Sequence, residues 1–196
     1  MIKTNINSKF PTHLRNCISG DKSLYVADYT ESTSSQRGTK LFFGTPPAGR
    51  DYIEHFSLHN NDRLQITGIV FNNRSFTRPD GNPRSQCECV VFPDVSNNES
   101  WIFFLELKYS SRDYNNVNNL NKARRQLFKT QYYYKSEGIF TAKNTCYLIA
   151  SLPLQSEPFA NMVLGQSYLL DMKEKHNIVI RFQNSAEIID DKQINV

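Results

Sequence analysis

The chain of 196 residues has no long hydrophobic run, and no segment approaches the ~20 apolar residues that span a bilayer. Residues 1–6 also lack the apolar core of a signal peptide. Together these absences predict a cytoplasmic protein with no membrane partner. The four cysteines are too few for a disulfide framework at this length, so reduced thiols are expected.

The sequence also lacks the motifs of several enzyme classes. The glycine- and proline-rich segment at 44–49 ends without the Lys-Ser/Thr pair that a phosphate-binding loop requires. No serine or cysteine has a partner base at a recognisable spacing, which argues against nucleophilic catalysis. With no repeat and 39% hydrophobic residues, the chain is long enough for one well-cored domain.

Charge is unevenly distributed along the chain. Residues 51–107 hold eight Asp/Glu and four Lys/Arg, whereas residues 108–143 hold eight Lys/Arg and two Asp/Glu. An acidic segment is therefore followed directly by a basic one, although the net charge is only +4. This order suits a polyanion held by the basic segment and cut at a metal ion in the acidic one. A mixed, solvated surface would also account for the pattern.

Hydrophobic periodicity predicts a mixed α/β domain. Helices are expected at 50–58, 120–134 and 160–173, and strands at 24–27, 40–43, 64–71, 87–92, 101–108, 145–150 and 178–182. In the helix at 120–134, Leu120, Ala123, Leu127 and Tyr134 form an apolar face, and Lys122, Gln126, Lys129 and Tyr133 form a polar stripe opposite it. Residues 1–49 are expected to be an N-terminal extension, and residues 50–196 the core.

The strands at 87–92 and 101–108 read as a β-hairpin that carries charges into apolar strands. Because side chains alternate along a strand, Glu106 and Lys108 share a face. A turn centred near residue 97 places Glu88 opposite Glu106. Such a cluster is costly in an apolar sheet unless it holds a cation or performs chemistry. An incidental Glu-x-Lys on an exposed strand is the competing interpretation.

Paired carboxylates beside a lysine suit Mg²⁺, which one or two carboxylates typically hold together with substrate phosphate and water. Such an ion activates a water molecule and polarises a phosphoryl group. Lys108, on the same face as Glu106, would reach the attacking water or the charged phosphoryl group. We therefore expect Glu88, Glu106 and Lys108 to be catalytic, with Mg²⁺ or Mn²⁺ as the cofactor.

The segment resembles the core of the PD-(D/E)xK nuclease superfamily, which has a restriction-endonuclease-like fold. Glu106-Leu107-Lys108 is similar to its (D/E)-x-K motif, whereas Glu88 stands where the family has Asp and has no preceding Pro. The resemblance covers roughly residues 50–150. It implies a central mixed sheet flanked by helices and hydrolysis of DNA phosphodiester bonds.

The resemblance also implies further site residues. The Leu107 carbonyl would assist the metal, Glu54 would be an additional acid, and Asp80 of a Pro-Asp pair is a reserve candidate for Glu88. Substrate would be contacted from the helix by Lys122, Arg125, Gln126, Lys129 and Tyr133. The helix lacks the Gln-x-x-x-Tyr spacing that is common in the family. A homodimer or a larger nucleoprotein complex is compatible with this function.

Two alternatives remain open at the level of the sequence. The first is a non-catalytic module on the same fold that binds nucleic acid or protein. The second is a zinc-stabilised binding protein, with His55, His59, Cys87 and Cys89 as ligands. The sequence supports the zinc hypothesis less, because the Cys-x-Cys spacing is unusual for structural zinc and buried free cysteines behave as small hydrophobic residues.

Overall fold

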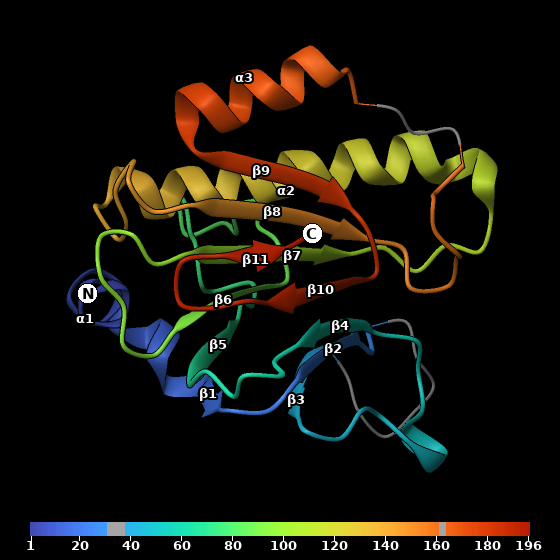
Figure 1. Cartoon of the computed structure of the whole chain (residues 1–196), viewed down its shortest axis with the longest axis horizontal. Coiled ribbons are helices and arrows are strands. Elements are labelled where there is room, and N and C mark those ends of the chain that lie inside the picture. Colours follow the sequence, from blue (N-terminus) through green and yellow to red (C-terminus); the bar gives the residue numbers. More distant parts are fainter. Residues whose placement is uncertain (31–37, 161–163) are drawn as a thin grey trace.

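The computed structural model describes residues 1–30, 38–160 and 164–196 and has three layers (Figure 1). Helices cover one face of a central six-stranded sheet, and a second sheet of five strands covers the other face. The predicted α/β class and the mixed central sheet are confirmed. The second sheet was not predicted, because its strands come from distant parts of the chain.

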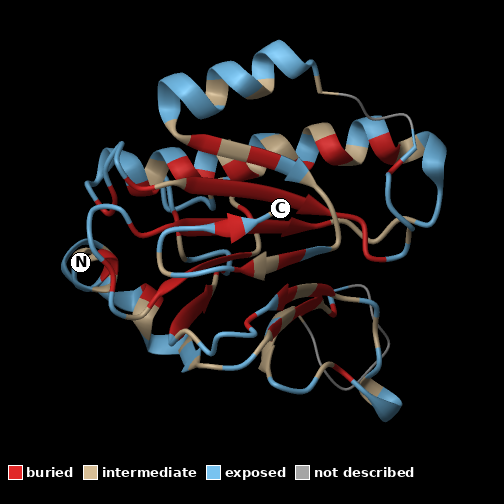
Figure 2. Cartoon of the chain, in the orientation of Figure 1, coloured by how far each residue is buried: buried red, intermediate tan, exposed pale blue. Residues whose placement is uncertain are grey.

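The central sheet has the order β1-β5-β6-β7-β8-β9. Its strands are β1 (Cys17–Gly20), β5 (Ile66–Val70), β6 (Cys89–Pro93), β7 (Ile102–Leu107), β8 (Cys146–Ser151) and β9 (Ile178–Phe182). The first four strands pair antiparallel in this order, and β7, β8 and β9 pair parallel. Every residue of β6, β7 and β8 is buried, because both faces of the sheet are covered (Figure 2).

The second sheet has the order β11-β10-β4-β2-β3. It contains β2 (Leu24–Asp28), β3 (Thr39–Phe43), β4 (Phe56–His59), β10 (Ser185–Ile188) and β11 (Ile194–Asn195). The strands expected at 24–27 and 40–43 are confirmed as β2 and β3, which pair antiparallel. The expected helix at 50–58 is wrong. A short 3₁₀ turn, η2 (Gly49–Asp51), and β4 occupy that segment instead, because Phe56 and Leu58 alternate into the inter-sheet core.

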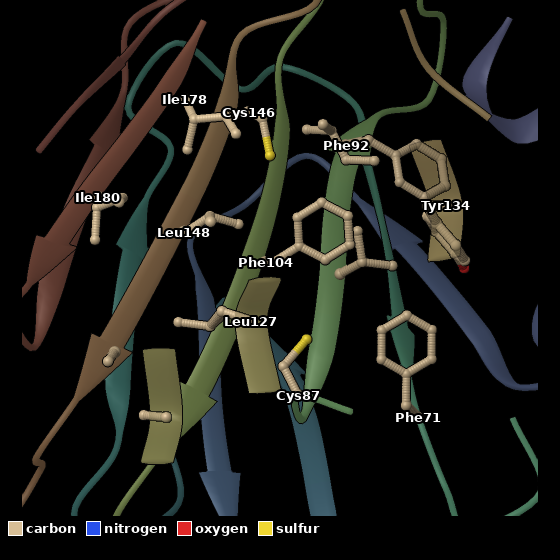
Figure 3. Packing of buried hydrophobic residues seen from close by; sticks show 14 of the residues in the cluster. Phe71, Cys87, Phe92, Phe104, Leu127, Tyr134, Cys146, Leu148, Ile178 and Ile180 are labelled. Carbon is tan, nitrogen blue, oxygen red and sulfur yellow. The ribbon is translucent and has the colours of Figure 1, made fainter. Parts of the chain in front are cut away.

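Helices pack on the opposite face of the central sheet. They are α1 (Ile2–Lys9), α2 (Asn116–Ser136) and α3 (Gln166–His176), with the 3₁₀ turns η1 (Pro11–Asn16) and η3 (Asp113–Asn115). The predicted apolar face of α2 is confirmed, since Leu120, Ala123, Leu127 and Tyr134 are all buried. Figure 3 shows Leu127 and Tyr134 packed with Phe104 of β7 and Leu148 of β8. The expected helix at 160–173 begins later, as α3, and part of that segment lies outside the described residues.

Residues 1–49 contribute to all three layers. Ile2 and Ile6 of α1 join the helical core, β1 pairs with β5, and β2 and β3 belong to the second sheet. Strand β2 ends at Asp28, which lines one pocket with Glu88 and Lys108 at the end of the β6–β7 hairpin. Among the residues with described placement, no helix has the length and apolar character needed to cross a membrane.

Candidate active site

The β6–β7 hairpin has the register that the sequence predicts. Cys89 pairs with Leu105 and Val90 with Phe104, which continues to Glu88 opposite Glu106. Glu88 lies just before β6, and its backbone N–H donates a hydrogen bond of 3.0 Å to the Leu105 carbonyl. The two carboxylates therefore meet at the same end of the hairpin.

Glu106 is a fully buried carboxyl group, with 0% of the residue exposed. Its Oε1 pairs with the Lys108 ammonium, whereas its Oε2 is buried and has no hydrogen-bond partner within the described part of the chain. Burial raises the pKa of Glu106 to about 8. The charge of Glu88 also raises this pKa, whereas the charge and the hydrogen bond of Lys108 lower it. Glu106 Oε2 is thus a buried acceptor without a hydrogen-bond partner in the described chain, which is unusual for a buried polar atom.

Glu88 is held by the second sheet. The Thr39 hydroxyl of β3 donates a hydrogen bond to Glu88 Oε2. Burial raises the pKa of Glu88, the Thr39 hydrogen bond opposes this shift, and the Asp28 charge adds to it. Carboxylates from both sheets, Asp28 of β2 and Glu88 beside β6, therefore line the same pocket.

Asp28 and Tyr109 belong to the site and were missed by sequence reasoning. The charge of Asp28 raises the pKa of both Glu88 and Glu106. The Asp28 backbone N–H donates to the Tyr109 hydroxyl at 3.1 Å, and that hydroxyl donates to the Glu54 carbonyl at 2.6 Å. The available signal was an acid directly after the apolar strand at 24–27, but its partner strand is distant in sequence.

A pocket of about 640 Å³ opens at this end of the hairpin. Its lining residues are Asp28, Thr30, Ile53, Glu88, Leu107, Lys108, Tyr109, Asn119, Lys122 and Leu154. Glu106 does not line this pocket, but it forms an ion pair with Lys108, which does. Of the predicted site residues, the structure brings together Glu88, Glu106, Leu107, Lys108 and Lys122.

Three other predicted residues lie elsewhere. Glu54 is exposed between η2 and β4, and its Oε1 accepts a hydrogen bond of 2.7 Å from the Tyr52 hydroxyl. Asp80 lies in the turn of the β5–β6 connection and lines a different pocket. Arg125 is exposed and lines a third hollow with Phe128. None of the three lines the Glu88–Lys108 pocket.

The remaining members of the predicted polar stripe lie further along α2. The Gln126 side-chain amide donates to the Gln86 carbonyl at 2.8 Å, so this residue supports the chain that leads into β6. Lys129 and Tyr133 line the same pocket as Asp80. The stripe therefore leads away from the acids along α2.

The donor set suits a hard cation better than zinc. Over the described ranges, no three His, Cys, Asp or Glu side chains gather at metal-binding distance. Alternation along the predicted strand at 87–92 would place Cys87 and Cys89 on one face. This expectation is wrong: the two cysteines lie in the cores on opposite faces of the sheet, because β6 begins only at Cys89. The open Oε2 of Glu106 and the neighbouring Glu88 fit Mg²⁺, which needs only one or two carboxylates when phosphate and water complete its shell.

Comparisons of the chain with protein-family models, with curated proteins and with solved structures found no match. The functional argument therefore depends on the residues and geometry of the site.

Proposed function

We propose that the protein is a metal-dependent nuclease that hydrolyses phosphodiester bonds of DNA. The observation that carries this proposal is the buried Glu106 carboxyl group. It has one oxygen on Lys108 and the other without a partner in the described chain, next to a pocket that Glu88 lines. A buried, half-satisfied carboxyl group costs folding free energy, so a role in binding a cation explains its presence.

Glu88 and Glu106 would hold the metal ion, with the Leu107 carbonyl as a further oxygen ligand. Mg²⁺ or Mn²⁺ bound there supplies an activated water molecule and a Lewis acid for the phosphoryl group. Asp28, which adds negative charge from the second sheet, would increase the affinity of the site for the cation.

Lys108 would place a positive charge where the transition state gains negative charge. Its side chain is 18% exposed, so its ammonium group is partly screened from water. Lys122 lines the same pocket and would bind a substrate phosphate from α2. Contacts of this kind position a DNA backbone and carry no sequence information.

The order of elements supports the resemblance to PD-(D/E)xK nucleases. Strands β5, β6 and β7 form an antiparallel meander, and α2 then connects β7 to the parallel strand β8. The acidic position precedes β6, and Glu106-Leu107-Lys108 ends β7, as that pattern requires.

The test is cleavage of plasmid and linear DNA with Mg²⁺ or Mn²⁺ by the native protein and by Lys108→Met. Methionine keeps the apolar stem and removes the charge, so we expect a loss of about 10³-fold in rate. Lys192→Met is the matched control, because Lys192 pairs with Glu99 at the other end of the hairpin. It should retain native activity.

The alternative function has a distinct outcome. DNA binding with no metal-dependent cleavage of any substrate would contradict the nuclease proposal and favour a non-catalytic binding module. Cleavage that Lys108→Met retains in full would contradict the role given to this site.

A further inference from the structure

A second pocket, of about 590 Å³, lies between α2 and the β5–β6 connection at residues 71–88. Its lining residues are Arg78, Pro79, Asp80, Arg84, Ser85, Lys129 and Tyr133. Three cationic side chains thus face one carboxylate. None of these residues lines the pocket beside Glu88 and Lys108.

Arg84 is held in position within this pocket. Its guanidinium carbon lies over the Tyr133 ring, 5.2 Å from the ring centroid. Its backbone N–H donates to the Phe76 carbonyl at 2.8 Å. Its Nε is buried and has no hydrogen-bond partner in the residues with described placement, which leaves a strong donor unsatisfied. Arg84 lines the pocket, and a planar guanidinium group matches the geometry of a phosphate.

The turn that carries Arg78 is ordered by its own hydrogen bonds. Thr77 and Pro83 form an antiparallel bridge, and the Arg78 N–H donates to the Asn82 carbonyl at 2.8 Å. Asp80 accepts hydrogen bonds from the Asn82 backbone at 3.0 Å and from its side-chain amide at 3.1 Å. The one carboxylate of the pocket is therefore occupied within the turn, while Arg78 is exposed.

The pocket lies in line with the candidate active site along α2. Lys122 marks the active-site end, and Lys129 marks the Arg84 pocket. Between them is a hollow of about 490 Å³ that Glu88, Gln86 and Gln126 line. Seven helical residues at ~1.5 Å each separate the two lysines by about 10 Å along the axis. The phosphates of each strand of B-DNA recur every ~3.4 Å along the helix axis, so a duplex whose axis follows α2 presents about three phosphates of one strand over this spacing.

We propose that Arg84, with Arg78 and Lys129, binds a backbone phosphate of the DNA strand about three phosphates from the bond that is cut. This inference rests on the proposed nuclease function for the position of the cut, but the binding of the strand does not require catalysis. The pocket makes the enzyme favour strands that extend beyond the active site in one direction.

The first experiment measures binding without cleavage. Fluorescence anisotropy in EDTA, with a labelled single strand of about 12 nucleotides, compares the native protein with Arg84→Gln over a range of salt concentrations. We expect five- to twentyfold weaker binding, and a log–log salt slope shallower by about 0.7.

Arg63→Gln is the matched control. It makes the same chemical change at an exposed arginine that pairs with Asp21. This residue precedes β5 at Ile66, which pairs with Pro93 at the far end of the sheet from Glu106. The control should bind within twofold of the native protein. If Arg84→Gln fails to fold, Arg78→Gln, in the exposed turn, tests the same pocket.

Native affinity and native salt slope in the folded Arg84→Gln and Arg78→Gln variants would overturn the proposal. Equally tight binding of free inorganic phosphate would also overturn it, because a strand site requires the connected backbone.

The second experiment measures cleavage by the native protein of strands shortened from either end. We expect the rate at low substrate concentration to fall when fewer than about three nucleotides remain on one side of the cut. This advantage of the longer strand should disappear in Arg84→Gln through KM, with kcat unchanged. An equal advantage in native protein and variant would overturn the proposal. Absence of all cleavage, with Arg84-dependent binding intact, would instead refute the nuclease function alone.

Discussion

The two ends of the β6–β7 hairpin bury polar groups in opposite ways. At the turn end, the Trp101 Nε1–H donates to the Asp190 carbonyl at 2.8 Å, and the Asn144 amide donates to the Asn97 and Ser100 carbonyls at 2.9 and 2.7 Å. At the open end, Glu106 Oε2 has no partner in the described chain. The same two strands thus carry one end built from satisfied contacts and one end with an unsatisfied carboxyl group.

Under the proposed function, this difference separates an end that contributes to stability from an end that contributes to catalysis. Satisfied buried groups contribute to a single native state, whereas unsatisfied ones cost free energy and are retained where chemistry needs them. Substitutions should therefore have opposite consequences at the two ends. The turn end should lose stability and keep activity, and the open end should lose activity and keep stability.

The largest effect is expected for Glu106→Gln. Loss of the carboxylate should reduce metal-dependent cleavage by about 10³-fold, since the metal loses a ligand. The melting temperature in EDTA should stay equal or rise, because an uncharged amide of similar shape replaces a desolvated carboxyl group. Thermal unfolding and a cleavage assay on the same preparation measure both quantities.

Glu99→Gln is the control for that substitution, because its carboxylate is exposed and pairs with Lys192. It should change neither quantity appreciably. A Glu106→Gln protein that unfolds well below the native melting temperature would show that this carboxyl group is a structural element and would remove the contrast between the ends.

Asn144→Ala should have the next largest effect. The buried amide bridges two carbonyls of the hairpin turn, and its Oδ1 accepts from the Thr141 N–H at 2.9 Å. Its removal leaves these groups unsatisfied and should lower the free energy of unfolding by about 2 kcal/mol. Urea denaturation measures this loss. Cleavage per folded molecule should remain native, and a large loss of specific activity would contradict the separation of the two ends.

Asp28→Asn tests whether the second sheet contributes to the open end. Asp28 adds a negative charge near Glu88 and Glu106, so its removal should weaken Mn²⁺ binding and lower the cleavage rate about tenfold at limiting metal. Excess metal should restore much of the rate. Asp62→Asn, a change in the exposed turn before β5, is the comparison and should have no effect. If Asp28→Asn kept the native dependence of cleavage on metal concentration, the metal site would consist of hairpin residues without Asp28.

His13 provides the smallest test, since it is a satisfied buried group that does not line the Glu88–Lys108 pocket. Its ring nitrogens lie 2.9 Å from the Tyr134 hydroxyl and 2.7 Å from the Ser75 carbonyl, and burial lowers its pKa. The folded state thus favours neutral histidine, so its contribution is complete above pH ~6.5 and is lost as the pH falls below it.

The loss is at most ~1.4 kcal/mol per pH unit. Urea unfolding of native protein and His13→Gln between pH 7.5 and 5 measures it. The stability difference between the two proteins should shrink as the pH falls. A difference that stays constant would show that His13 does not titrate on unfolding.

The sequence predicted the local parts of this architecture well. The hairpin register and the buried face of α2 followed from alternation and helical spacing, and the strands at 24–27 and 40–43 were also found. The same reasoning placed Glu88, Glu106 and Lys108 together. The role proposed for them remains a prediction.

The parts that sequence reasoning missed depend on contacts between distant segments. Asp28 reaches the site only because β2 joins β4 and the later strand β10 in a second sheet. The segment at 50–58 has mixed periodicity, and inter-sheet packing made its end a strand. Arg84 lies in a long connection without periodicity. Its contact with the Tyr133 ring depends on how this connection packs on α2, which the sequence pattern does not show.

The most direct test of the metal site is anomalous diffraction from crystals soaked in Mn²⁺. The account predicts a peak within about 2.2 Å of a Glu106 carboxylate oxygen and close to Glu88, and no such peak in Glu106→Gln crystals. No peak at Glu106 in the native protein, with its Oε2 bonded to an ordered water molecule instead, would contradict the account.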